Sequence, residues 1–198
     1  LDYQFSGPWY GCGPFSVWDD EGLGTHWRNR EPGLPFYVLV NFQVTLECGV
    51  FRPLGNWPNS MTHLVLQVLR ALRSPEVAAS GVVAPEDVSL PPYYPDTPTV
   101  RADVARHYNN IAVMDAEVGA LLRQLEEDGL ADSTIVIWTT DHGDGLPRGK
   151  RELYDSGIKV PMIIHWPERF RPEGVAPGSV ETRLVSFVDF APTLLRLA

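Results

Sequence analysis

The chain of 198 residues is long enough for one domain with a sizeable core, or for part of a larger domain. Hydrophobic residues make up 44% and charged residues 21% of it, a globular composition that excludes a disordered chain. The net charge of −9 argues against nucleic acid or an anionic membrane surface as the main partner. No apolar run approaches the roughly 20 residues that span a bilayer, so we expect no transmembrane segment.

The first half of the chain predicts one strand and one helix between long loops. Residues 1–35 are rich in Gly, Pro and Trp and have no sustained period, which is typical of a loop. The apolar run over 35–44 predicts a strand that is buried on both faces. Helical spacing of apolar residues predicts a helix over 61–73, and the proline-rich stretch 74–98 predicts an extended loop.

The two chain ends predict a part of a longer protein, and the two cysteines do not predict a zinc site. Residue 1 is not Met, and the sequence stops inside a helical pattern, so we expect the natural protein to extend beyond both ends. Cys12 and Cys48 lack the CxxC spacing of a zinc site. We expect two free, buried thiols, with a disulfide between them as the alternative.

The strongest helical pattern covers 100–128. Gly129 is placed to end this helix. Asp115 falls in its apolar stripe, where we expect the carboxylate to bond a nearby backbone N–H or hydroxyl. The stripe itself recurs at three- and four-residue steps and consists of Val104, Tyr108, Ile111, Val118, Leu122 and Leu125.

The second half predicts two buried strands and a closing helix. The strands cover 134–140 and 158–166, and the final helix has Asp189 near its N-cap and Pro192 in its first turn. Alternation of strands and helices in this order is typical of an α/β fold. We expect a mostly parallel central sheet with helices on both faces.

Chemistry concentrates directly after the strand over 134–140. In open α/β sheets, ligands bind beyond the carboxyl ends of the strands, which is where Asp141 and His142 lie. The chain turns at Gly143, so both side chains can converge on one divalent cation, although two ligands cannot complete a site. Asp144 precedes a glycine and is interpreted as a turn residue.

A group of cations follows on the same glycine-containing loop. Lys150 lies nine residues after Asp141 and can return to the crevice to hold an oxyanion beside a metal. Arg148 and Arg151 are interpreted as solvated loop residues. His165 is expected to be a satisfied structural histidine in a buried strand.

Several separated stretches, in order, resemble the later half of the catalytic domain of sulfatases, within the alkaline phosphatase superfamily. The resemblance covers about 160 of the 198 residues. It rests on NNIAVMDAEVGALLRQLEEDGLADSTIVIWTTDHG, GKRELYDSGIKVPMIIHWP and LVSFVDFAPTLLRLA, and more loosely on LPFYVLVNFQVTLE.

This resemblance implies an incomplete alkaline phosphatase-like fold and hydrolysis of a sulfate ester on a small molecule or saccharide. It implies that Asp141 and His142 are ligands of a divalent cation, calcium in the family, and that Lys150 contacts the sulfate of the substrate. It also implies a secreted, periplasmic or lysosomal location.

Three departures from the family pattern matter. The family attacks sulfate with a formylglycine made from a Cys/Ser-x-Pro-x-Arg motif, which neither Cys12, Cys48 nor any serine provides. The early Asp-Asp pair of the calcium site is absent, since Asp19-Asp20 is interpreted as a solvated turn. Leu46 stands where the family usually has a histidine. We therefore expect residues 1–198 to be a partial catalytic domain that lacks its upstream, nucleophile-bearing portion and a downstream portion, and to be inactive alone.

Two alternatives to a sulfatase remain open. A phosphohydrolase of the same superfamily would also use an Asp-His-Gly turn and would bind two zinc or manganese ions. A degenerate, non-catalytic member would explain Leu46 and the missing nucleophile.

Overall fold

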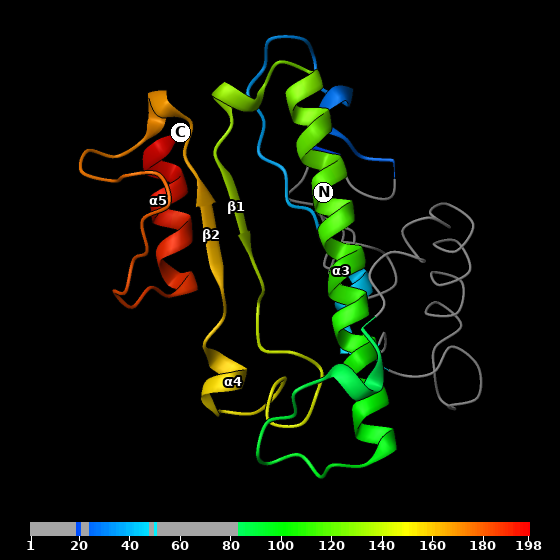
Figure 1. Cartoon of the computed structure of the whole chain (residues 1–198). Coiled ribbons are helices and arrows are strands. Elements are labelled where there is room, and N and C mark those ends of the chain that lie inside the picture. The colour runs from blue at the N-terminus through cyan, green and yellow to red at the C-terminus, as the bar shows by residue number, and fades with distance from the viewer. Residues whose placement is uncertain (1–18, 21–23, 48–49, 51–82) are drawn as a thin grey trace.

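The computed structural model describes residues 19–20, 24–47, 50 and 83–198. Its helices of four or more residues and its strands are α3, β1, α4, β2 and α5, in chain order (Figure 1). The helix predicted over 61–73 and the two cysteines, Cys12 and Cys48, lie outside the described residues.

The long helix α3 spans Pro98–Glu127 and begins at a sequence signal for a helix start. The hydroxyl of Thr97 accepts a hydrogen bond from the backbone N–H of Val100 at 3.3 Å. Pro98 occupies the first helical position, where a backbone N–H would have no partner within the helix, so the lack of one in proline costs nothing. The helix predicted over 100–128 is therefore confirmed, with its start two residues earlier.

The C-terminal end of α3 is a Schellman motif. Gly129 has a φ of 67°, in the left-handed region that glycine adopts without strain. The N–H of Gly129 donates to the carbonyl of Glu126 at 2.9 Å, and the N–H of Leu130 donates to that of Leu125 at 3.0 Å. These two bonds satisfy carbonyls that the helix end would otherwise leave unpaired.

A small hydrophobic cluster packs on the N-terminal half of α3. Val104 and Ala105 of the helix are buried against Val88, which precedes it in the chain. Leu146 joins the cluster from the loop that follows residue 140, so the cluster fixes that loop against α3. The partly buried members are Val83, Leu90, Tyr94, Val100 and Leu146.

The rest of the predicted apolar stripe is only partly covered. Tyr108, Ile111 and Leu122 are exposed, because no described element covers that face of α3. Asp115 is exposed too, so its position in the predicted stripe does not face a core.

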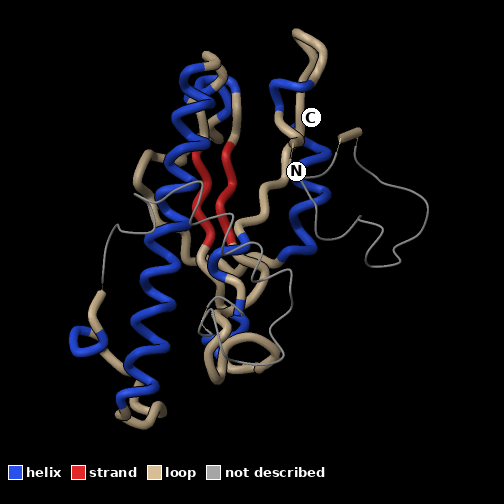
Figure 2. Tube along the Cα trace, turned by 90° about the vertical axis from the view of Figure 1, so that its right-hand side faces the viewer, coloured by secondary structure: helices blue, strands red, loops and turns tan. Residues whose placement is uncertain are grey.

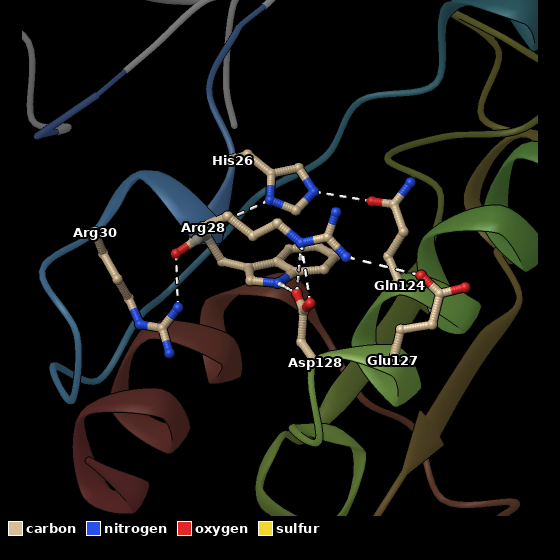
Figure 3. Close-up of polar contacts among 7 residues, drawn as sticks. His26, Arg28, Arg30, Gln124, Glu127 and Asp128 are labelled. Carbon is tan, nitrogen blue, oxygen red and sulfur yellow. Dashed lines mark hydrogen bonds and ion pairs between the residues drawn. The ribbon is translucent and has the colours of Figure 1, made fainter.

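An N-terminal loop crosses the C-terminal end of α3 (Figure 3). The indole N–H of Trp27 donates to Asp128 at 2.6 Å, and the Nε of Arg28 donates to both oxygens of the same carboxylate at 3.0 and 2.8 Å. His26 accepts from the backbone N–H of Arg28 at Nδ1, so its Nε2–H donates to the side-chain oxygen of Gln124 at 2.9 Å. Trp27 is buried beneath these contacts, which fasten the loop to the helix.

The two described strands pair antiparallel. β1 spans Val136–Thr139 and β2 spans Met162–His165, with Val136 opposite His165 and Thr139 opposite Met162. Parallel neighbours are usually joined by a crossover helix, whereas the loop between these strands contains only the single helical turn α4, Asp155–Ile158. A mostly parallel sheet is thus not seen in the part of the chain that the structure describes.

The strand predicted over 35–44 does not form. From Pro35 to Val40 the side chains alternate between exposed and half-buried, the period of a strand, but the segment joins no ladder and ends in a 3₁₀ turn at Gln43–Thr45. A strand needs a partner for its N–H and C=O groups, and among the described residues β1 and β2 pair only with each other. The predicted two-sided burial is therefore wrong.

The strand predicted over 158–166 forms as β2 but is not buried. Ile163 and His165 are exposed, while Ile164 is half-buried. The interpretation of His165 as a buried structural histidine is wrong, because no described element covers that face of the strand.

The closing helix α5 spans Phe190–Leu197 and has no buried residue. The carboxylate of Asp189 accepts a hydrogen bond from the backbone N–H of Ser186 at 3.0 Å, so it closes the preceding turn rather than capping α5. Figures 1 and 2 both place β1 and β2 between α3 and α5. None of the helices in the described part of the chain combines the length and the apolarity that a membrane crossing needs.

Candidate functional site

β1 leads directly into the turn that carries Asp141 and His142. The backbone N–H of Gly143 donates to the carbonyl of Gly157 at 3.0 Å and ties this turn to α4. A Cβ atom at position 143 would overlap the carbonyl oxygen of Ser156, so the close approach requires glycine. The predicted turn at Gly143 is confirmed, and it brings the two side chains together.

The hydrogen bond of His142 fixes which ring nitrogen can bind a ligand. Nδ1 lies 2.7 Å from the carbonyl oxygen of Gly143, and because a carbonyl can only accept, Nδ1 carries the proton of the neutral ring. Nε2 then has a free lone pair and lies 3.4 Å from Oδ2 of Asp141.

The donor set fits part of a divalent cation site. The carboxylate of Asp141 is exposed and is a donor that Ca²⁺ prefers, while the imidazole of His142 is a softer ligand. Within 19–20, 24–47, 50 and 83–198, no group of three or more His, Cys, Asp or Glu side chains could hold a metal ion. Within that part of the chain, Asp141 and His142 are therefore two donors without a third, which is fewer than a divalent cation needs.

Asp144 organises the loop between the turn and Lys150. Its Oδ1 accepts from the backbone N–H of Leu146 at 3.1 Å, and its carbonyl accepts from the backbone N–H of Lys150 at 2.7 Å. The interpretation of Asp144 as a turn residue is confirmed. Its Oδ2 also lies 3.8 Å from Nε2 of His107 on α3, which connects the loop to the long helix.

A small cavity of about 90 Å³ lies under this loop. His107 lines it and is buried, with Nδ1 lacking a hydrogen-bond partner among the described residues. Burial lowers the pKa of His107, and the nearby Asp144 opposes that shift, so the ring is neutral near pH 7. Tyr94 closes one side by donating to the carbonyl of Pro147 at 2.8 Å, and burial raises the pKa of its hydroxyl to about 12.

Glu47 joins the site from a distant part of the sequence. Its carboxylate accepts two hydrogen bonds from the guanidinium of Arg151, both at 2.8 Å, and lies 3.7 Å from Nζ of Lys150. The Arg151 hydrogen bonds are the main reason that the pKa of Glu47 is lowered, so it is charged at neutral pH. A Cβ on Gly145 would meet Glu47 Cα at 2.5 Å, which shows how closely the two segments approach.

The two arginines on the loop are not simply solvated. Arg151 pairs with Glu47, and Arg148 stacks its guanidinium on the rings of Tyr93 and Tyr154, with centroids 4.5 and 4.8 Å from Cζ. Both side chains are exposed, as the interpretation of solvated loop residues expects, and each has a partner as well. A run of charges in a loop gives no sign of partners such as Glu47 and Tyr93, which lie more than 50 residues away in the sequence.

Three of the residues that the sequence singled out lie on this turn and the loop that follows it. Asp141 and His142 lie side by side, and the backbone of Lys150 is bonded to the same turn through Asp144. Glu47 is the residue that sequence reasoning missed. Its only signal is its place in the stretch that loosely resembles a family strand, beside Leu46 at the usual histidine position.

The sulfatase family model matches residues 33–198, so the chain belongs to the sulfatase family. Membership of the sulfatase family implies an α/β fold of the alkaline phosphatase type. The described helices and two-stranded sheet are a part of such a fold that is too small to display its parallel sheet.

Three sulfatase relatives match between 46% and 99% of the chain. An ulvan-active sulfatase of Formosa agariphila is 38% identical over 212 residues, covering 99% of this chain and 33% of that protein. N-sulphoglucosamine sulphohydrolase of Homo sapiens is 31% identical over 169 residues, covering 81% of this chain and 31% of that enzyme. Steryl-sulfatase of Mus musculus is 33% identical over 107 residues, covering 46% of this chain and 16% of that enzyme. The chain thus spans about a third of the length of the first two relatives. No solved structure matches it.

Proposed function

We propose that the chain is part of the catalytic domain of a metal-dependent sulfuric ester hydrolase that acts on a sulfated saccharide. Family membership supports the reaction class. The saccharide is supported by two relatives whose names specify ulvan and N-sulphoglucosamine and which match most of the chain. A small-molecule sulfate ester is the other substrate class that the family admits.

The observation that carries this proposal is the link between the Asp141–His142 turn and Lys150. The backbone N–H of Lys150 bonds to the carbonyl of Asp144, which anchors the lysine to the loop that follows the turn. Its ammonium has three donors and, among the residues that the structure describes, a single long contact, to Glu47 at 3.7 Å. Lys150 can therefore turn to a sulfate oxygen and neutralise charge as the ester bond breaks.

Asp141 and His142 would hold the divalent cation, Ca²⁺ by family resemblance. Bound there, the cation supplies positive charge that stabilises the sulfate oxygens. The nucleophile is the formylglycine of the family motif, which residues 1–198 do not contain. We accordingly propose that these residues are a partial catalytic domain, inactive without the nucleophile-bearing portion.

The decisive test is hydrolysis of 4-nitrophenyl sulfate by the full-length protein that contains this chain. Lys150→Ala should lower kcat/KM by about 100-fold or more, the usual loss when a donor to developing negative charge is removed. Lys159→Ala is the matched control, because this exposed lysine pairs with Asp155 at 2.7 Å on the surface of α4. Equal activity of the Lys150→Ala variant and the wild type would remove Lys150 from the site.

The two alternatives predict other outcomes in the same experiment. A phosphohydrolase would cleave 4-nitrophenyl phosphate faster than the sulfate and would retain zinc or manganese. A degenerate member would cleave neither substrate.

The metal assignment has its own test. Titration of Ca²⁺ into the metal-free full-length protein, followed by calorimetry, should give one strong site that Asp141→Asn weakens by about 10-fold or more. Asp132→Asn, an exposed change in the turn before β1, should leave the affinity unchanged. Equal Ca²⁺ affinity of the Asp141→Asn variant and the wild type would contradict the assignment.

A further inference from the structure

The guanidinium of Arg148 packs against two aromatic rings. Its Cζ lies 4.5 Å from the centroid of Tyr93, which precedes α3, and 4.8 Å from that of Tyr154, which precedes α4. Such cation–π contacts do not use the N–H groups as hydrogen-bond donors to the rings' substituents. Among the described residues, no group accepts a hydrogen bond from the side chain of Arg148, so its donors are available to a ligand.

The backbone of Arg148 is held in place as firmly as its side chain. Its carbonyl accepts from the hydroxyl of Ser156 at 2.7 Å, and the carbonyl of the preceding Pro147 accepts from Tyr94 at 2.8 Å. Its φ is 68°, a left-handed conformation that is strained for arginine and that glycine would adopt freely. The loop thus carries backbone strain at a position occupied by a large cationic side chain, and such strain is common at functional sites.

Arg148 is also the cation of this loop that no carboxylate neutralises. Lys150 and Arg151 share Glu47, whereas no acidic side chain in the described part of the chain forms an ion pair with Arg148. The residue is exposed, as are Tyr93 and Tyr154 beside it. An anion in solvent can therefore reach the free edge of the guanidinium, where a carboxylate or sulfate can accept two parallel hydrogen bonds.

The distance to Lys150 along the chain is short. Two residues span at most about 7 Å between Cα atoms, so both cations are within reach of one oligosaccharide. The exposed parts of Tyr93 and Tyr154 add apolar surface of the kind that covers the C–H faces of a sugar.

We propose that Arg148, Tyr93 and Tyr154 form a second anion-binding subsite, which takes a carboxylate or a further sulfate on the same saccharide whose sulfate ester meets Lys150. The inference rests on the proposed function and deepens it, because it makes the substrate a polyanionic saccharide. Lys150 holds the sulfate that is removed, and Arg148 holds the acidic group that is kept.

The test compares three ligands by calorimetry on the full-length protein that contains this chain. N-acetylglucosamine 6-sulfate has one acidic group, its 3,6-disulfate has a second sulfate, and its disaccharide with glucuronic acid has a carboxylate. The wild type should bind the two dianions about 10-fold more tightly than the monoanion, the size of a charged hydrogen bond. Arg148→Gln should abolish this preference and leave the monoanion affinity unchanged.

Two matched variants separate the subsite from general charge and from loop structure. Arg151→Gln removes the same charge three residues away and should change all three affinities in equal proportion. Arg148→Lys retains a cation without the planar fork, so it should lose the carboxylate preference more than the sulfate preference. Because Arg148→Lys keeps the positive charge of the loop, it tests the subsite even if Arg148→Gln lowers the melting temperature of the protein.

Each outcome decides between the two proposals. A preference for dianions that survives Arg148→Gln, a wild type without any preference, or an equal loss for all three ligands would overturn the subsite. Lys150→Ala should weaken all three ligands alike. If it weakens none while Arg148→Gln still abolishes the preference, the subsite stands and the proposed role of Lys150 fails.

Discussion

Glu47 determines how much positive charge the loop after β1 presents to an anion. Its carboxylate holds Arg151 by two hydrogen bonds and competes with any oxyanion for Lys150. We expect Glu47→Gln to strengthen binding of inorganic sulfate to the chain by about 2- to 5-fold, the range of a partly screened ion pair. Calorimetric titration with sodium sulfate, at constant ionic strength, measures this.

Glu152→Gln is the control for this prediction. It removes an equal charge from the residue after Arg151, where the carboxylate has no partner among the described residues. Weaker sulfate binding by Glu47→Gln than by Glu152→Gln would show that Glu47 positions Lys150 rather than competing for it.

At the level of residues, the sequence predicts what is local and misses what is distant. Asp141 and His142 follow a strand pattern directly, and their convergence needs only the turn at Gly143. The ion pair between Glu47 and Arg151 joins residues 104 positions apart. No periodicity or turn signal marks such a contact, because it depends on how a whole segment lies against the loop.

Among the elements, the turn after β1 depends on its close approach to α4. Gly143→Ala would place a methyl group against the carbonyl of Ser156 and break the hydrogen bond to Gly157. Overlap of this kind costs about 1–3 kcal/mol, so amide exchange in the segment around residues 141–158 should accelerate by roughly 5- to 150-fold. Gly24→Ala is the control, because a Cβ at Gly24 would meet nothing within 4 Å. Unchanged exchange would show that the turn can move away from α4 at no cost.

The C-terminal end of α3 depends on one carboxylate. Asp128 accepts from Trp27 and Arg28 (Figure 3), and the Arg28 hydrogen bond is the main cause of its lowered pKa. A lowered pKa stabilises the fold above the ordinary carboxyl value, and this contribution is lost as the pH falls through the lowered pKa. At pH 7, Asp128→Asn should therefore increase amide exchange in the loop over residues 24–36.

The difference in amide exchange between Asp128→Asn and the wild type should depend on pH. It should shrink from about pH 5 toward pH 3 and below, because the wild-type carboxylate becomes protonated there. Glu127→Gln serves as the matched control, since Glu127 is exposed and 3.9 Å from Arg28, and it should change exchange little. A difference that stays constant over this pH range would assign the effect to shape rather than to charge.

Elements were predictable where their stability is local. The 30-residue α3 carries its own start and end signals at Thr97 and Gly129, and it forms as predicted. A strand depends on a partner strand, which an apolar pattern does not reveal. The pattern over 35–44 therefore forms no ladder, and the pattern over 158–166 forms the exposed strand β2.

For the whole molecule, the apolar surface on the β2 and α5 side is the largest departure from an ordinary globular surface. Ile163 on β2, Leu184 before α5 and Leu195 on α5 are all more than 60% exposed. Isolated exposed apolar residues are common, but many on neighbouring segments mark a surface that another part of a protein covers. This agrees with a chain that spans about a third of its relatives.

We therefore expect the 198-residue chain to self-associate and to bind the dye ANS, and the full-length protein to do neither. Leu184→Ser combined with Leu195→Ser should reduce both effects, because it removes two side chains that are 98% and 80% exposed. Sedimentation velocity at several concentrations and ANS fluorescence measure them. The control is Val104→Ala, a change in the buried cluster on α3, which should lower stability by about 1–3 kcal/mol without reducing association of the native chain. A monomeric chain without ANS binding would show that this apolar surface is covered within the chain itself.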